Sequence, residues 1–184
     1  MKDSLMFLSS FIRNPRETGA LTASSKFLTR EIVKNINFKK ARKIAELGPG
    51  VGTFTKEILK KSHPDTNIFC FEVNRKFCRH LECSMGSNIT ILNAGAQKLS
   101  ENLMKLGVGK VDCIVSGLPF RNFSMAKRKK ILGQVAMSLN EKGKFILFQY
   151  TNGLLELLGK YFSKVEREFV ALNVPPSFIY ICGK

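Results

Sequence analysis

The sequence predicts one α/β domain built on a mostly parallel, seven-stranded sheet with helices on both faces. From residue 43 onward, short apolar runs alternate with amphipathic helical segments, as expected for parallel strands joined by crossover helices. A glycine-rich loop follows the first run, and only Asn173-Val174-Pro175-Pro176 separates the last two. Because so short a connection leaves no room for a crossover helix, the last two strands should pair in antiparallel orientation. The length of 184 residues suits a single domain.

Two helical segments are expected before the sheet. The apolar side chains of residues 3–13 mostly fall on one side of a helix, and an Asn-Pro pair then breaks this segment. A loop through Gly19 follows. Ser24 or Ser25 can cap the second helix, in which apolar residues again recur at helical spacing. We therefore expect helical structure over most of residues 1–40.

Strands and helices alternate through the rest of the chain. Apolar runs predict strands at residues 43–47, 67–73, 88–92, 111–116, 144–150, 165–172 and 177–182. Helical periodicity predicts helices at residues 53–61, 74–85, 99–106, 124–139 and 154–162. Asn74 is a suitable N-cap for the second of these helices, and Gly143 precedes the fifth strand. These elements belong to one globular domain over residues 41–184.

The charge of the chain is strongly positive. Thirty Lys and Arg residues face fourteen Asp and Glu residues, which gives a formal net charge of +16. A field of this size favours polyanionic partners, either nucleic acid or an anionic membrane surface, and charge alone does not separate the two. Basic residues are concentrated in residues 26–43 and in Lys127-Arg128-Lys129-Lys130.

Cysteine and histidine usage bears on the compartment and on metals. The five cysteines are odd in number and form no Cys-x-x-Cys pair, and only two histidines are present. We therefore expect a reducing cytoplasm and no metal site. No apolar run approaches the ~18 residues of a transmembrane helix, and the N-terminus lacks the features of a signal peptide.

The glycine loop predicts a nucleotide-like cofactor. Gly48, Gly50 and Gly52 follow the first strand, where glycine lets the backbone adopt positive φ and approach a ligand closely. The helix that begins near Thr53 directs its free N–H groups toward this place. Glu72 closes the second strand, where its carboxylate can accept hydrogen bonds from ribose hydroxyls. A glycine loop followed by such an acid fits both NAD and S-adenosylmethionine (SAM).

The spacing of the loop resembles SAM-dependent methyltransferases. The run Glu46-Leu47-Gly48-Pro49-Gly50-Val51-Gly52 has Gly-x-Gly-x-Gly spacing and resembles their motif I, and residues 40–184 resemble the Rossmann-like class I enzymes. In that family a Gly-Asp-Ala sequence usually packs on adenine, whereas this chain reads Ala94-Gly95-Ala96-Gln97. The resemblance implies SAM contacts from Glu46, Gly48, Pro49, Gly50, Gly52, Thr53, Phe54, Glu72, Val73, Gly95, Ala96, Gln97 and Ser116.

The fourth strand ends in a sequence that bears on the methyl acceptor. Ser116-Gly117-Leu118-Pro119-Phe120 resembles the Asn-Leu-Pro-Tyr motif of adenine N-methylating enzymes, with Gly117 in place of the asparagine and Phe120 keeping the aromatic ring. The motif I segment is also similar to rRNA adenine dimethylases. Those enzymes add a C-terminal helical domain and keep polar residues where Gly95 and Gly117 stand. A base-flipping enzyme needs polar groups to hold its base, so the substitutions count against nucleic acid.

Several segments together resemble the small bacterial phospholipid N-methyltransferases. These are residues 19–25, the Ser116–Phe120 run, Gln149-Tyr150, and Asn173-Val174-Pro175-Pro176-Ser177. The resemblance implies SAM-dependent N-methylation of phosphatidylethanolamine or a related amino-phospholipid. Substrate alignment would come from Ser116, Gly117, Leu118, Pro119, Phe120 and Tyr150, with no general base and no metal.

The same resemblance gives the N-terminus a role. Residues 1–40 are expected to cover the cleft and face an anionic membrane, with residues 3–13 as an interfacial helix. The protein would then be cytoplasmic and peripheral to the inner face of the membrane. Two alternatives stay open: an rRNA or other nucleic-acid adenine N6-methyltransferase, and a catalytically idle SAM-binding module or RNA binder.

Overall fold

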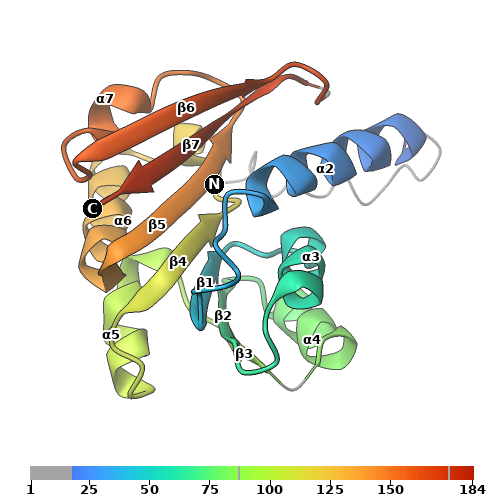
Figure 1. The fold of residues 1–184 in the computed structure, drawn as a ribbon, viewed down its shortest axis with the longest axis vertical. Helices are drawn as coiled ribbons and strands as arrows, with labels where there is room; N and C mark the ends of the chain where they lie inside the picture. Colours follow the sequence, from blue (N-terminus) through green and yellow to red (C-terminus); the bar gives the residue numbers. More distant parts are fainter. Residues whose placement is uncertain (1–17, 87, 174) are drawn as a thin grey trace.

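The protein folds around a twisted seven-stranded sheet, seen in a computed structural model that describes residues 18–86, 88–173 and 175–184 (Figure 1). The strands are β1 (Lys43–Leu47), β2 (Asn67–Phe71), β3 (Ile89–Leu92), β4 (Val111–Ser116), β5 (Leu139–Gln149), β6 (Lys164–Val170) and β7 (Ser177–Gly183). Their order in the sheet is β3-β2-β1-β4-β5-β7-β6. Strands β1 to β5 pair in parallel, and β7 is antiparallel to both of its neighbours. The predicted fold class and antiparallel end are confirmed.

Helices cover both faces of the sheet. They are α2 (Thr18–Val33), α3 (Thr53–Lys61), α4 (Arg75–Ser84), α5 (Leu99–Lys105), α6 (Met125–Ser138) and α7 (Leu155–Leu158), with single 3₁₀ turns at Ala96–Lys98 and Phe120–Asn122. Helices α2, α3 and α4 lie on one side of the sheet, and α5, α6 and α7 lie on the other (Figure 1). Among the described helices, none is long and apolar enough to cross a membrane.

Alternating side chains of the strands form two cores. In β1, Ile44 packs in the cluster beneath α2 and α3, whereas its neighbour Ala45 packs beneath α5 and α6. The same alternation separates Val115 from Ile114 in β4. Because successive side chains of a strand point to opposite faces, a fully apolar strand must be covered on both. The central strands are therefore held between two helical layers.

Several element boundaries differ from the sequence-based expectation; β2 and β6, for example, each end two residues early, at Phe71 and Val170. Helix α2 begins at Thr18, before the expected cap at Ser24 or Ser25, so Gly19 lies inside the helix. The segment between contains no proline, and extending a helix is easier than starting one. Helix α7 ends at Leu158, because the chain continues in a tighter turn in which the N–H of Tyr161 donates to the carbonyl of Leu158, three residues earlier. The expected helix over residues 3–13 lies outside the described residues.

Strand β5 also begins earlier than expected. It starts at Leu139, which pairs with Val111, and the register then shifts so that Lys144 pairs with Cys113. Gly143 therefore lies within the strand and does not precede it. A Cβ atom on Gly143 would lie 2.9 Å from the carbonyl oxygen of Asn140, so this irregularity requires glycine.

Candidate functional site

The loop after β1 lies where the sheet order reverses, between β1 and β4. Its three glycines all have positive φ: 73° at Gly48, 56° at Gly50 and 83° at Gly52. A Cβ atom on Gly48 would lie 2.8 Å from the side chain of Leu118, whereas one on Gly50 would meet nothing within 4 Å. The loop is thus packed against the segment after β4 at Gly48 and open at Gly50. An open glycine backbone at this edge is suited to close approach of a ligand.

The carboxylate of Glu72 is fixed at the edge of this loop. Glu72 follows the last residue of β2, and its side chain accepts hydrogen bonds from the backbone N–H of Gly50 at 3.2 Å and of Asn74 at 2.8 Å. Asn74 in turn caps α4, where its side chain accepts a hydrogen bond from the Lys76 N–H. This confirms Asn74 as the cap. The carboxylate is therefore oriented before any ligand binds.

Glu46 lies beneath the loop, with no exposed surface. One carboxylate oxygen accepts hydrogen bonds from the Thr55 hydroxyl at 2.7 Å and the Cys70 thiol at 3.7 Å. The other oxygen has no hydrogen-bond partner among the residues that the structure describes. Burial away from water raises the pKa of this carboxyl group to about 7. Glu46 therefore supports the loop from below and titrates near neutrality.

The segment after β3 carries the departure at Gly95. A Cβ atom on Gly95 would lie 2.7 Å from the side-chain oxygen of Gln97 and 3.6 Å from Val73. The Gln97 amide thus occupies the space where an acidic side chain at position 95 would begin. Val73 is exposed, whereas Ala96 is buried. The polar amide of Gln97 and the apolar side chain of Val73 therefore both lie next to Gly95.

The segment after β4 packs directly on the glycine loop. The N–H of Gly117 donates to the Leu47 carbonyl at 3.0 Å, and the buried Ser116 hydroxyl accepts from the Leu118 N–H at 3.2 Å. A Cβ atom on Gly117 would lie 3.1 Å from the Gly48 carbonyl oxygen, which is tighter than ordinary contact. Gly117 is therefore more than a flexible turn, because any side chain there would press on the loop.

Residues after β5 complete this region. The side-chain nitrogen of Gln149 donates to the Leu118 carbonyl at 2.9 Å. Tyr150 is 43% exposed and contacts Phe148 edge-on at 5.6 Å between ring centroids, and Phe148 lies 5.7 Å from Phe54. Three aromatic rings thus run from the start of α3 to the end of β5. Burial raises the pKa of the Tyr150 phenol above its usual value, so it stays protonated near neutral pH.

Phe120 is buried, whereas stacking on a substrate needs an exposed aromatic ring. It is only 1% exposed, belongs to the core cluster beneath α6, and packs 6.1 Å from Phe123. A single 3₁₀ turn starts at Phe120 and folds its side chain inward. Phe120 also contributes to the lining of one pocket. Its role as a substrate-aligning residue stays a prediction.

That pocket has a volume of about 310 Å³ and lies at the carboxyl ends of β4 and β5. Its lining residues are Phe120, Arg121, Arg128, Gln149, Thr151, Asn152, Gly153 and Leu154. Sequence reasoning missed both arginines and the 151–154 segment. Arg128 was noted only as part of a basic cluster, and a loop without a motif gives no signal that it lines a pocket.

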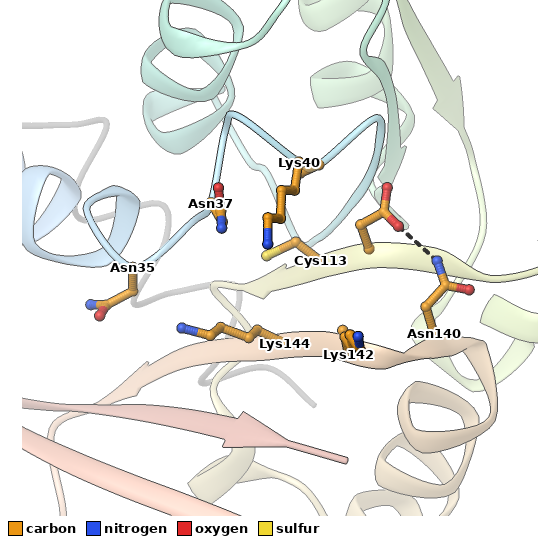
Figure 2. Close-up of a pocket in the computed structure, with 10 residues that line it drawn as sticks. Asn35, Asn37, Lys40, Cys113, Asn140, Lys142 and Lys144 are labelled. Atoms are coloured by element: carbon orange, nitrogen blue, oxygen red, sulfur yellow. Dashed lines mark hydrogen bonds between the residues drawn. The ribbon is translucent and has the colours of Figure 1, made fainter.

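A second pocket, of about 170 Å³, lies at the opposite edge of the sheet (Figure 2). Its lysines are Lys40, Lys142 and Lys144, and its only carboxylate is that of Asp112. This edge carries the starts of β1, β4 and β5. The pocket is therefore separated from the glycine loop by the length of the strands.

Comparisons with known proteins agree with this geometry. The family model described as ribosomal RNA adenine dimethylase matches residues 22–163. An ornithine lipid N-methyltransferase of Singulisphaera acidiphila is 29% identical, over 99% of this chain and 96% of its own length.

Two solved structures share the fold. Magnesium protoporphyrin IX methyltransferase (ChlM) from Synechocystis, solved with bound SAM, superposes with a TM-score of 0.72 at 10% identity, covering 94% of this chain and 86% of its own. The N-methyltransferase NodS from Bradyrhizobium japonicum gives a TM-score of 0.70 at 11% identity, covering 88% of this chain and 98% of its own. At these identities, the likeness shows the fold alone.

Proposed function

Since this chain belongs to the ribosomal RNA adenine dimethylase family and is a SAM-dependent N-methyltransferase, we propose that it methylates the amine of an amino-lipid, phosphatidylethanolamine or a close relative. A relative that aligns over nearly the whole chain is an ornithine lipid N-methyltransferase, which supports a lipid acceptor. The fold does not by itself imply an adenine acceptor, because one fold can support reactions on many different substrates.

The observation that carries the proposal is Gly117. In adenine-methylating enzymes, an asparagine or aspartate at this place accepts a hydrogen bond from the target amine. Here a Cβ atom would already lie 3.1 Å from the Gly48 carbonyl, so a side chain at this position would press on the glycine loop. A planar base would have to be held without that polar group, whereas the amine of a lipid can be positioned through contacts to the rest of its headgroup.

The residues of the loop suit SAM. The open backbone at Gly50 and the oriented carboxylate of Glu72 can accept the ribose, and the Gln97 amide and Val73 side chain lie where adenine contacts are expected. Glu46 has no exposed surface and accepts a hydrogen bond from Thr55. Its effect on SAM would therefore be indirect, through the position of the glycine loop. Bound SAM supplies a methyl group already activated on a sulfonium centre.

The chain itself must align the amine and keep it unprotonated. A partly desolvated site lowers the pKa of an ammonium group, which raises the fraction of neutral amine. The rings of Phe54, Phe148 and Tyr150 offer faces that tolerate the positive charge that grows on the methylated nitrogen. Because Tyr150 stays protonated, it does not act as a base. Alignment and desolvation are thus the main contributions of the protein.

A basic surface supports access to the lipid. The net charge of +16 attracts the protein to anionic bilayers, where each basic residue near the surface contributes about 1 kcal/mol. We therefore propose a peripheral position at an anionic membrane, with residues 1–40 facing it and residues 41–184 forming the catalytic domain.

The test supplies radiolabelled SAM together with vesicles that contain phosphatidylethanolamine, vesicles that contain ornithine lipid, or ribosomal RNA. We expect label in lipid and none in RNA. Phosphatidylcholine vesicles, which offer no free amine, serve as the control. Label in RNA alone would replace the proposal with adenine methylation, the second candidate, which the family match favours. Binding of SAM without label in any acceptor would indicate an idle SAM-binding module.

A further inference from the structure

The pocket of about 310 Å³ is joined to the glycine loop by two contacts. Gln149 lines the pocket and donates its side-chain N–H to the Leu118 carbonyl at 2.9 Å. The Leu118 side chain in turn packs on Gly48, at 2.8 Å from the place of a Cβ atom. Since both contacts lie at the carboxyl edge of the sheet, the pocket is on the acceptor side of the cofactor loop.

The charge of this pocket is one-sided. Its lining includes Arg121 and Arg128 and, among the residues that the structure describes, no acidic residue. Within the described part of the chain, neither arginine forms an ion pair with a carboxylate. Two unpaired guanidinium groups beside a polar amide are suited to bind an anionic oxygen group, because each presents several donors in a fixed plane.

The Arg128 side chain is already oriented. Its Nε donates to the Phe123 carbonyl at 2.9 Å, and its Nη2 donates to the Arg121 carbonyl at 2.8 Å. These bonds tie the guanidinium to the turn that carries Arg121, so the two arginines are held near each other. An oriented donor loses less side-chain freedom on binding than a freely moving one.

We propose that Arg121 and Arg128 bind the anionic group of the acceptor lipid, either a phosphodiester or a carboxylate, and so hold its amine toward the glycine loop. This inference rests on the proposed function and adds the headgroup element that is recognised. In phosphatidylethanolamine a short ethanolamine arm separates amine from phosphate, and in an ornithine lipid a short side chain separates amine from carboxylate. Anchoring either anion limits where the amine can lie.

The second pocket does not serve this role, although it is lined by three lysines (Figure 2). The Asp112 carboxylate also lines it and accepts hydrogen bonds from the Arg42 and Lys43 N–H groups and from Asn140. A carboxylate in the wall opposes an anion, and the pocket opens at the far edge of the strands. In the arginine pocket the charged lining residues are both cationic, and the pocket lies at the carboxyl edge of the sheet.

The experiment measures kcat and KM for lipid methylation in phosphatidylcholine–detergent micelles. The acceptors are phosphatidylethanolamine, an ornithine lipid, and a long-chain primary amine that lacks an anionic group. Arg121→Gln is compared with Arg121→Lys and with Lys129→Gln, an exposed residue of α6 outside the pocket lining. Arg128 is left intact because its side chain also holds the turn.

We expect Arg121→Gln to raise KM for the lipid whose anion is bound by about tenfold, with little change in kcat or in KM for the simple amine. The affected lipid identifies phosphodiester or carboxylate. Arg121→Lys should recover part of the loss, and Lys129→Gln should resemble the wild type. Equal KM values for Arg121→Gln and Lys129→Gln would overturn the inference.

The proposed function and this inference fail separately. If the wild type binds SAM but labels no lipid, the proposed function is wrong, and the pocket is judged by binding alone. Titration with glycerophosphoethanolamine and with ornithine, followed by NMR, should then show weaker binding of at least one by Arg121→Gln than by Lys129→Gln. The absence of any difference would reject the pocket as an anion site.

Discussion

Among single residues, Gly48 joins the two halves of the candidate site. Its φ of 73° is costly for any other residue, and the space for a Cβ atom is filled by Leu118 at 2.8 Å. Its carbonyl in turn limits what position 117 can carry. The glycine loop and the segment after β4 are therefore packed against each other, and a substitution in one should displace the other.

Gly48→Ala should weaken SAM binding at least tenfold, because the methyl group forces Leu118 and the loop apart. The left-handed backbone conformation should also cost about 1 kcal/mol of folding stability. Gly107→Ala is the matched control, since Gly107 has φ 68°, an empty Cβ position and no place in the site. Isothermal titration with SAM and urea unfolding measure the two effects. Similar SAM affinity in the two variants would contradict the expected role of Gly48.

Glu46 predicts a pH dependence of stability in the SAM-free protein. Its folded-state pKa of about 7 exceeds the ordinary value of 4.5, so the native state binds more protons than the unfolded state between these pH values. The free energy of unfolding should therefore fall as pH rises from 4.5 to 7, by about 3 kcal/mol at full effect, and level off above 7.

Glu46→Gln removes this titration but keeps an oxygen that can accept from Thr55. Urea unfolding at pH 5, 6 and 7.5 should show a flatter pH profile for the variant than for the wild type. All other ionisable residues are the same in both proteins, so the difference between the profiles isolates Glu46. Parallel profiles would show that burial does not raise its pKa as described.

Among the elements, α2 is the one whose role the sequence left least defined. Leu28, Ile32 and Val33 are buried in the same cluster as Ile44 of β1 and Ile58 of α3. The described part of the N-terminal segment is thus packed on the sheet. We propose that α2 packs on the catalytic domain of residues 41–184 while residues 1–40 as a whole face the membrane.

Ile32→Ala should lower the free energy of unfolding by about 2–5 kcal/mol, because it removes a fully buried side chain. Lys26→Ala, on an exposed position of the same helix, should change it by less than about 0.5 kcal/mol. Chemical denaturation should show a single transition in both. A loss below about 1 kcal/mol for Ile32→Ala would indicate that α2 is only loosely attached.

Sequence periodicity located most elements because it reflects local geometry. The bounds of β1, α3 and β4 agree with the prediction, and Ser124, the first residue of the expected helix, is the N-cap of α6. Among the strands, the largest error is at the start of β5, where a distant partner decides the boundary. Leu139 joins β5 only because it pairs with Val111, and a contact of this kind leaves no local pattern.

At the scale of the whole molecule, the excess of positive charge predicts salt-sensitive membrane binding. Co-sedimentation with vesicles that contain phosphatidylglycerol should be strong at low ionic strength and should fall sharply as KCl rises toward 0.5 M, where screening is effective within a few ångströms. Vesicles of phosphatidylcholine alone serve as the uncharged control. Binding that is equal on both vesicles, or unaffected by salt, would contradict an electrostatic attachment.

The sequence by itself determined the sheet with its antiparallel end, the glycine loop and the cofactor class. These follow from strand and helix periodicity, short connections and positive φ, all of which act between near neighbours in the chain. Only the tertiary structure decided that Phe120 turns inward, that a side chain at position 117 would press on the Gly48 carbonyl, and that two arginines line one pocket with Gln149. These features arise where β1, β4 and β5 end side by side. Packing between segments so far apart in the chain leaves no pattern in the local sequence.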